Sequence, residues 1–296
     1  MQIAEQVYFL AQKQNDAALM TGACRALAGT FYYSGDFEIA RQYTTRALRI
    51  WRSSGVRFSF QEVDAQPVGC LSHHAILQWH FGEIRSCRAT IAEAISLAKE
   101  LNDKHGLAVA LSFAARLAHY ERAATQVERL ASDLIELSTR HSFAYWLAIG
   151  EVFRGWARSA SGRTTEGLSW IEEGLENYRA TGSIAWMAYF LTLKAEALYL
   201  ADRTPQALEA INEAEAVSER VGWRDCAVDI HRFRSAFLAT MGAEKTQIEA
   251  SFGEAIRIAK EQKSISLQKC TEATYAEYRR QKASGSGGHG FRLPLW

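Results

Sequence analysis

The chain has 296 residues, of which 48% are hydrophobic and 11% aromatic, a composition that indicates a folded protein with a large buried core. Its 34 Lys and Arg residues nearly balance its 33 Asp and Glu residues, so it lacks the basic surplus that favours nucleic acid or an anionic membrane. The five cysteines form no CxxC pair, and the N-terminal residues lack the apolar core of a signal peptide. The most apolar run, residues 143–150, is far shorter than the ~20 residues of a membrane helix. We therefore expect a cytoplasmic protein without disulfides, and neither nucleic acid nor a membrane as a partner.

Taken in order, the chain reads as a series of helical hairpins with a period of about 40 residues. A small or apolar residue marks the middle of each second helix; these residues are Ala47, Ala94, Leu134, Gly174, Ala214 and Ala255. The members from Ala94 to Ala214 follow one another at equal steps of one period. Each first helix carries a small residue where a neighbouring helix has to approach; these residues are Ala28, Ala75, Ala115, Gly155, Ala195 and Ala236.

Polar breaks separate the two helices of a hairpin, as at residues 34–36 and 161–163. Thr204 with Pro205 predicts a helix start, since threonine caps helices and proline fits the first turn. Apolar residues at three- and four-residue steps give each second helix one buried stripe. A hairpin with one stripe cannot bury it alone, so consecutive hairpins must stack. No alternating segment predicts a sheet.

Two stretches depart from the repeat. Residues 53–67 lengthen the first interval, and Pro67 with small and acidic neighbours predicts a loop there. Residues 264–280 predict a first helix without a second helix after it. From Lys282 the sequence becomes rich in glycine and serine. We expect a helical-repeat domain over residues 1–281 and a flexible tail over residues 282–296.

The internal pattern resembles tetratricopeptide repeats (TPR). The residues that carry the resemblance in the first hairpin are Leu27, Ala28, Phe31, Gly35, Ala40 and Ala47. The resemblance implies an all-α fold, a right-handed α-solenoid of about six to seven helix hairpins. The period in this chain is longer than the repeat that is usual in that family, which is about 34 residues.

The longer period is shared by the C-terminal TPR region of large bacterial signalling ATPases and adenylate cyclases. The chain is similar to that region over roughly residues 10–265, above all at residues 66–84, 154–182 and 189–214. The ATPase and catalytic portions of those proteins have no counterpart in this sequence. The chain is therefore either a free-standing solenoid or a piece of a longer protein.

First helices line the concave surface of TPR solenoids, so the resemblance implies a candidate groove. Its residues are Arg25, Trp79, Arg116, His119, Trp156, Tyr189, Glu196 and Tyr199. Aromatic side chains with a few charges suit a binding surface, because rigid rings lose little entropy on contact. The alternative for Trp79 and Trp156 is packing between helices.

The sequence contains no motif for catalysis or for a cofactor. It has no GxxxxGK[ST] phosphate loop, no HExxH and no GxSxG. The best metal candidate is a group of His and Cys residues: Cys70, His73, His74, His80 and Cys87. These residues occupy different helix faces, whereas zinc needs three or four ligands at one point, so packing is favoured. We expect no enzyme, no cofactor and no metal.

These patterns predict a non-catalytic regulatory solenoid of a bacterial signalling system. It would bind a protein or peptide on its concave face, with an ATPase or cyclase domain as one candidate partner. The alternative is a small-molecule-sensing helical-repeat domain of a signalling ATPase or transcription regulator.

Overall fold

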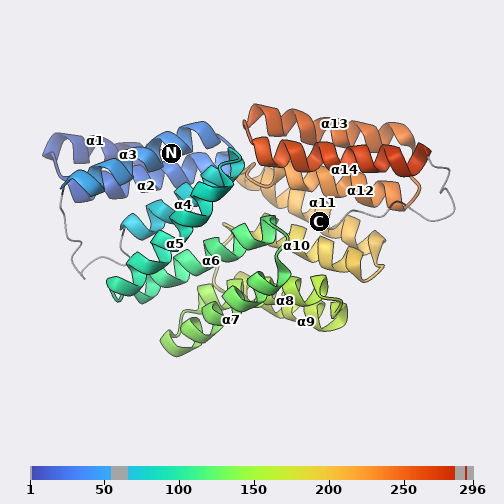
Figure 1. Ribbon diagram of the computed structural model, residues 1–296, viewed down its shortest axis with the longest axis horizontal. Helices are drawn as coiled ribbons and strands as arrows, with labels where there is room; N and C mark the ends of the chain where they lie inside the picture. Colours follow the sequence, from blue (N-terminus) through green and yellow to red (C-terminus); the bar gives the residue numbers. More distant parts are fainter. Residues whose placement is uncertain (1, 55–65, 284–290, 292–296) are drawn as a thin grey trace. The chain divides into compact units, whose positions relative to one another are not determined.

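The structure, a computed structural model, describes residues 2–54, 66–283 and 291, and all regular structure within these residues is α-helical. The fourteen helices of this part of the chain, shown in Figure 1, are α1 (Gln2–Gln14), α2 (Ala17–Ser34), α3 (Phe37–Ser54), α4 (Gln66–His80), α5 (Ile84–Glu100), α6 (Lys104–Tyr120), α7 (Ala124–His141), α8 (Ala144–Ala160), α9 (Thr164–Ala180), α10 (Met187–Leu200), α11 (Thr204–Val221), α12 (Ala227–Thr240), α13 (Lys245–Glu261) and α14 (Ile265–Ala283). The predicted all-α fold is thereby confirmed. Most of the expected loop at residues 53–67 lies outside the described residues. At both ends the expectation is wrong, because α3 continues to Ser54 and α4 begins at Gln66, so that Pro67 lies in the first turn of a helix, where proline is tolerated.

Consecutive helices pack as hairpins, with the tight α8–α9 and α2–α3 pairs as examples (Figure 1). First helices also pack on one another, since α10 contacts both α8 and α12, and α12 contacts α14. The predicted final first helix corresponds to α14, which extends a few residues further than expected. From α8 onward, the hairpins therefore share a first-helix side, on which α8, α10, α12 and α14 are successive neighbours.

The turns between helices show the repeat most directly. Residues with positive φ end the helices at evenly spaced positions; these residues are Gly82, Asn102, Arg122, Ser142, Gly162, Gly182, Asp202, Gly222 and Gly242. One helix with its turn therefore takes up half of the predicted period, and one hairpin takes up the whole of it. The left-handed conformation costs L-residues roughly 1–2 kcal/mol, which explains why five of the nine are glycines.

A very close helix contact in the repeat lies between α8 and α9. A Cβ atom added to Gly155 would lie 2.5 Å from the carbonyl oxygen of Gly167 and 2.6 Å from Cγ1 of Ile171. A Cβ on Gly174 of α9 would lie 2.8 Å from Val152 Cγ2. The expectation that Gly155 marks a close helix approach is confirmed, and Gly174 marks another on α9.

The chain divides into two compact units, Met1–Leu117 and Ala118–Trp296, with the boundary inside α6. The predicted single repeat domain over residues 1–281 spans both units and stays a prediction, as does the flexible tail. The tail is described only at its start, where α14 ends at Ala283, and at Phe291. None of the described helices combines the length and apolar character that a bilayer crossing requires.

Candidate functional site

The structure buries most of the eight predicted groove residues. Buried side chains are Trp79, Arg116, His119, Trp156, Tyr189 and Glu196, whereas Arg25 and Tyr199 are half-buried. Burial leaves the first six little surface for direct contact with a partner. Their role in binding stays a prediction. Their positions show which side chains pack between the first helices.

Four of the eight residues meet within residues 118–296, around an arginine that the sequence analysis did not select. Arg122 Nη1 donates a hydrogen bond of 2.9 Å to Glu196 Oε2, and Nη2 donates to Glu196 Oε1. The pair is bidentate, the strongest geometry for an arginine and a carboxylate. The Glu196 side chain is 0% exposed and that of Arg122 19%. We call this pair, together with His119, Trp156 and Tyr189, the ion-pair cluster.

The other three members enclose the pair. His119 places Nε2 3.5 Å from Glu196 Oε2 and Nδ1 2.8 Å from the Tyr189 hydroxyl. Its ring packs edge-on against Trp156 with 4.5 Å between centroids. The Arg122 guanidinium lies 5.1 Å from the centre of the Trp156 ring. The cluster thus joins the end of α6 and the following turn to α8 and α10.

Burial and charge together set the protonation of the cluster. Burial favours the neutral form of Glu196, but the Arg122 guanidinium and His119 outweigh it and lower the pKa of this carboxyl below its ordinary value. Burial lowers the pKa of His119, and the neighbouring Glu196 offsets only part of that effect. At neutral pH an ionised Glu196 therefore faces a charged Arg122 and a neutral His119. The hydrogen bond of 2.8 Å between His119 Nδ1 and the Tyr189 hydroxyl holds the neutral ring in place.

This arrangement holds helices together and is poorly suited to proton transfer. A general acid or base works best with a pKa near the operating pH, and the pKa of Glu196 is shifted the other way. Arg122 adopts φ 61, in a series of turn positions where three of its counterparts are also non-glycine and five are glycine. A bulky residue in this strained conformation persists only where its surroundings hold it, here through Glu196.

An aromatic row lies further along the first-helix side, on α10 and α12. The Tyr199 ring stacks on Phe237 at 5.2 Å, and Phe237 stacks on Phe233 at 5.9 Å. Phe291, from the predicted flexible tail, docks beside this row. Its carbonyl oxygen accepts hydrogen bonds from Thr240 Oγ1 at 2.7 Å and from the Tyr199 hydroxyl at 3.2 Å.

The Phe291 side chain completes the contact. Its ring packs edge-on against Tyr278 of α14 with 5.8 Å between centroids, and only 6% of the residue is exposed. Three successive first helices, α10, α12 and α14, therefore hold one residue of another segment. We call this site the first-helix face. It consists of the half-buried Tyr199 and Thr240 together with the buried rings of Phe233, Phe237 and Tyr278.

The remaining predicted groove residues belong to residues 1–117. Arg25 Nε donates to Gln66 Oε1, and the Arg116 guanidinium lies 5.4 Å from the centre of the Tyr32 ring. Trp79 packs edge-on against His80 at 5.3 Å. These three side chains pack within the unit.

The histidines considered as metal ligands are also packed. His80 stacks on Phe37 at 4.0 Å, and His73 lies 4.7 Å from Phe113. Burial lowers the pKa of His73 to about 4 and that of His80 well below its ordinary value. Across the described ranges, no three or more His, Cys, Asp or Glu side chains converge as a metal site would require.

Comparison with known proteins shows what this fold is similar to. The family model of anaphase-promoting complex subunit 5 matches residues 61–121 and 230–280. An uncharacterised protein of Rhizobium meliloti (strain 1021) is 25% identical over 216 residues, which cover 73% of this chain and 21% of that protein. The chain thus spans about a fifth of the length of the curated relative it matches.

Several solved structures have a similar fold. Bacillus thuringiensis PlcR, in complex with the peptide PapR7 and DNA, matches with TM-score 0.55 and 15% identity over 83% of this chain and 98% of PlcR. A Rap protein complexed with competence and sporulation factor matches with TM-score 0.58 and 10% identity over 90% of this chain and 76% of that one. Aspartyl phosphate phosphatase F from Bacillus subtilis matches with TM-score 0.54 and 10% identity over 91% of this chain and 74% of the phosphatase chain.

Identities this low establish the fold and nothing beyond it. The PlcR and Rap structures are TPR-like helical-repeat proteins, which confirms the repeat class that the sequence predicts. The narrower resemblance to the C-terminal region of signalling ATPases and cyclases stays a prediction. By its fold, this chain is a TPR-like helical-repeat protein.

Proposed function

We propose that the chain is a non-catalytic regulatory interaction module that binds an extended segment of a protein or peptide on its first-helix face. The observation that carries this proposal is the docking of Phe291. A backbone carbonyl of this residue accepts two hydrogen bonds from side chains of two first helices, and its ring is buried on a third. Hydrogen bonds to the main chain together with a buried side chain are the contacts by which proteins commonly hold an extended peptide.

The face suits an extended segment because it offers both kinds of contact that such a segment needs. Thr240 and Tyr199 are half-buried, and the hydroxyls with which they hold the Phe291 carbonyl would donate in the same way to a carbonyl of a bound peptide that takes the place of Phe291. The stacked rings of Phe237 and Phe233 beneath them provide a rigid apolar floor. The ion pair with Arg122 fixes α10 at Glu196, about one helical turn before Tyr199, so the face is organised before a partner arrives.

The regulatory part of the proposal draws on the relatives. Two of the similar structures are named as complexes with a peptide, PapR7 in one and competence and sporulation factor in the other. The curated relative is several times longer than this chain, which fits a repeat region attached to other domains. A bacterial signalling system, with an ATPase or cyclase domain as partner, is the finer form of this proposal.

The small-molecule alternative has less support, because the relatives with a named complex carry peptides. One of them also carries DNA, so the expectation that nucleic acid is no partner stays a prediction.

Site-specific photo-crosslinking in cells tests the proposal. A photoreactive phenylalanine analogue at Tyr199 places the probe on the first-helix face, and the same analogue at Trp170 of α9 is a matched, half-buried aromatic control on a second helix. We expect Tyr199 to crosslink to one segment of a partner, mapped by mass spectrometry, and Trp170 not to do so. Equal crosslinking from both positions, or none from Tyr199, would reject the proposal.

A further inference from the structure

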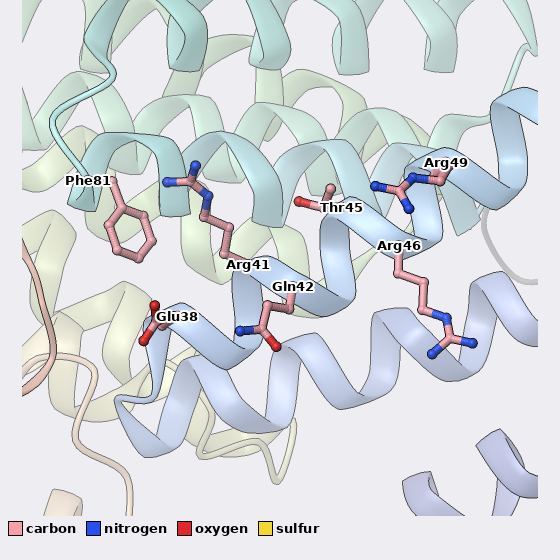
Figure 2. Close-up of a pocket in the computed structure, with 7 residues that line it drawn as sticks. All are labelled: Glu38, Arg41, Gln42, Thr45, Arg46, Arg49 and Phe81. Atoms are coloured by element: carbon pink, nitrogen blue, oxygen red, sulfur yellow. The ribbon is translucent and has the colours of Figure 1, made fainter.

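A second polar surface lies on α3 and shares no residue with the first-helix face. It is a surface groove of about 880 Å³ lined by Glu38, Arg41, Gln42, Thr45, Arg46, Arg49 and Phe81. Figure 2 shows Phe81 and Glu38 at one end and Arg46 and Arg49 at the other. The groove therefore has an aromatic and acidic end and a basic end.

The arginines at the two ends differ in what they contact. Arg41 Nη1 lies 2.8 Å from Glu83 Oε1, and its guanidinium lies 4.7 Å from the centre of the Phe81 ring. Arg46 and Arg49 are exposed. Arg46 rests 5.0 Å from the centre of the Tyr8 ring, and no carboxylate of the described residues forms an ion pair with Arg46 or Arg49.

Charge and length together define what fits the groove. Arg41 and Arg49 are eight residues apart on one helix, which corresponds to roughly 12 Å, the length of about four residues of extended peptide. Gln42 and Thr45 lie between the arginines and offer an amide and a hydroxyl to a peptide backbone. Arg46 and Arg49 are exposed and form no ion pair with a carboxylate of residues 2–54 or 66–283, so their guanidinium groups are complementary to carboxylates on such a segment.

We propose that the α3 groove binds a short acidic segment of a partner protein, with its carboxylates at Arg46 and Arg49. A nucleic-acid backbone fits less well. Glu38 lines the groove, and Glu83 forms an ion pair with Arg41, another residue of the lining. Both carboxylates would repel a continuous row of phosphates. The chain as a whole carries a formal charge of only +1, too little for the long-range attraction that nucleic acids need.

The test is fluorescence anisotropy of a fluorescein-labelled oligoglutamate peptide titrated with the full chain at low salt. The groove variant is Arg46→Gln/Arg49→Gln. The matched control is Arg129→Gln/Arg140→Gln, which removes two exposed arginines from α7 and changes the net charge equally. Circular dichroism verifies that both variants keep their helices.

We expect the wild type and the control to bind with similar affinity and the groove variant to bind about tenfold more weakly. Added salt should weaken the binding, because exposed charges are screened. The proposal fails if the wild type does not bind, if the control loses as much affinity as the groove variant, or if a labelled oligouridylate of equal charge binds as tightly through the same arginines.

Discussion

The ion-pair cluster gives the sharpest prediction, because one substitution leaves a charge without its partner. Glu196→Gln keeps the shape of the side chain and one oxygen that can accept from Arg122, but removes the negative charge. Breaking a buried ion pair costs roughly 3–5 kcal/mol. The Arg122 side chain is 19% exposed and regains some water contact, so we expect the lower end of that range, a loss of about 3 kcal/mol of unfolding free energy.

The opposite substitution, Arg122→Gly, has two effects of opposite sign. It leaves the fully buried Glu196 carboxylate with only His119 beside it, which is destabilising. It also relieves the left-handed backbone at φ 61, which is worth about 1 kcal/mol or more. We expect a net loss of about 2 kcal/mol. The double variant should lose at least ~1.5 kcal/mol less than the sum of the two, because each substitution removes the same interaction.

Urea unfolding at pH 7, followed by circular dichroism and by tryptophan fluorescence, measures these values. The two signals must change together if one free energy is to describe the transition. Glu136→Gln is the matched control, since Glu136 and Arg140 form an exposed pair on α7 that should contribute less than about 1 kcal/mol. If the effects of Glu196→Gln and Arg122→Gly are additive, or if neither loss exceeds that of the control, the conclusion that the ion-pair cluster holds the helices together is refuted.

Two further predictions follow from packing and from the buried histidines. Gly155→Ala should destabilise the chain by at least about 2 kcal/mol, because its Cβ would lie 2.5 Å from a backbone oxygen. Gly253→Ala, at an exposed position of α13 with open space around it, should stabilise the chain by about 0.5–1 kcal/mol. Thermal unfolding of both variants compares them, and equal effects would contradict the packing. Burial lowers the pKa of His73 from 6.5 to about 4 in the folded chain, so the unfolded chain takes up a proton first as the pH falls. The free energy of unfolding should therefore decrease as the pH drops from 6.5 to about 4, by at most about 3 kcal/mol. The urea midpoint measured from pH 7 to pH 4 should fall over this window and fall less in His73→Gln; an unchanged slope in the variant would count against the burial of His73.

The repeat could be predicted because its signals are local. Gly155 and Gly174 mark close helix contacts, and glycine at the turns marks helix ends. Helix boundaries were less well determined. Thr204 is predicted to cap α11, but the helix already includes it and Arg203 precedes it without a capping side chain, although Pro205 lies in the first turn as expected.

The arrangement of the candidate site could not be predicted from local pattern. Arg122 and Glu196 are 74 residues apart, and only the packing of α10 near the end of α6 brings them together. The groove positions taken from the TPR pattern select His119 and Trp156, but the pattern does not indicate that they are buried beneath an ion pair. Arg122 itself lies in a turn, where an arginine ordinarily indicates solvent exposure.

Hydrogen–deuterium exchange of the chain with and without the partner recovered by crosslinking tests the central claim most directly. The account predicts that the partner slows exchange at the C-terminal ends of α10 and α12, around Tyr199 and Thr240, and leaves α9 and α11 unchanged. Protection confined to α9 and α11, with none on the first-helix face, would contradict it.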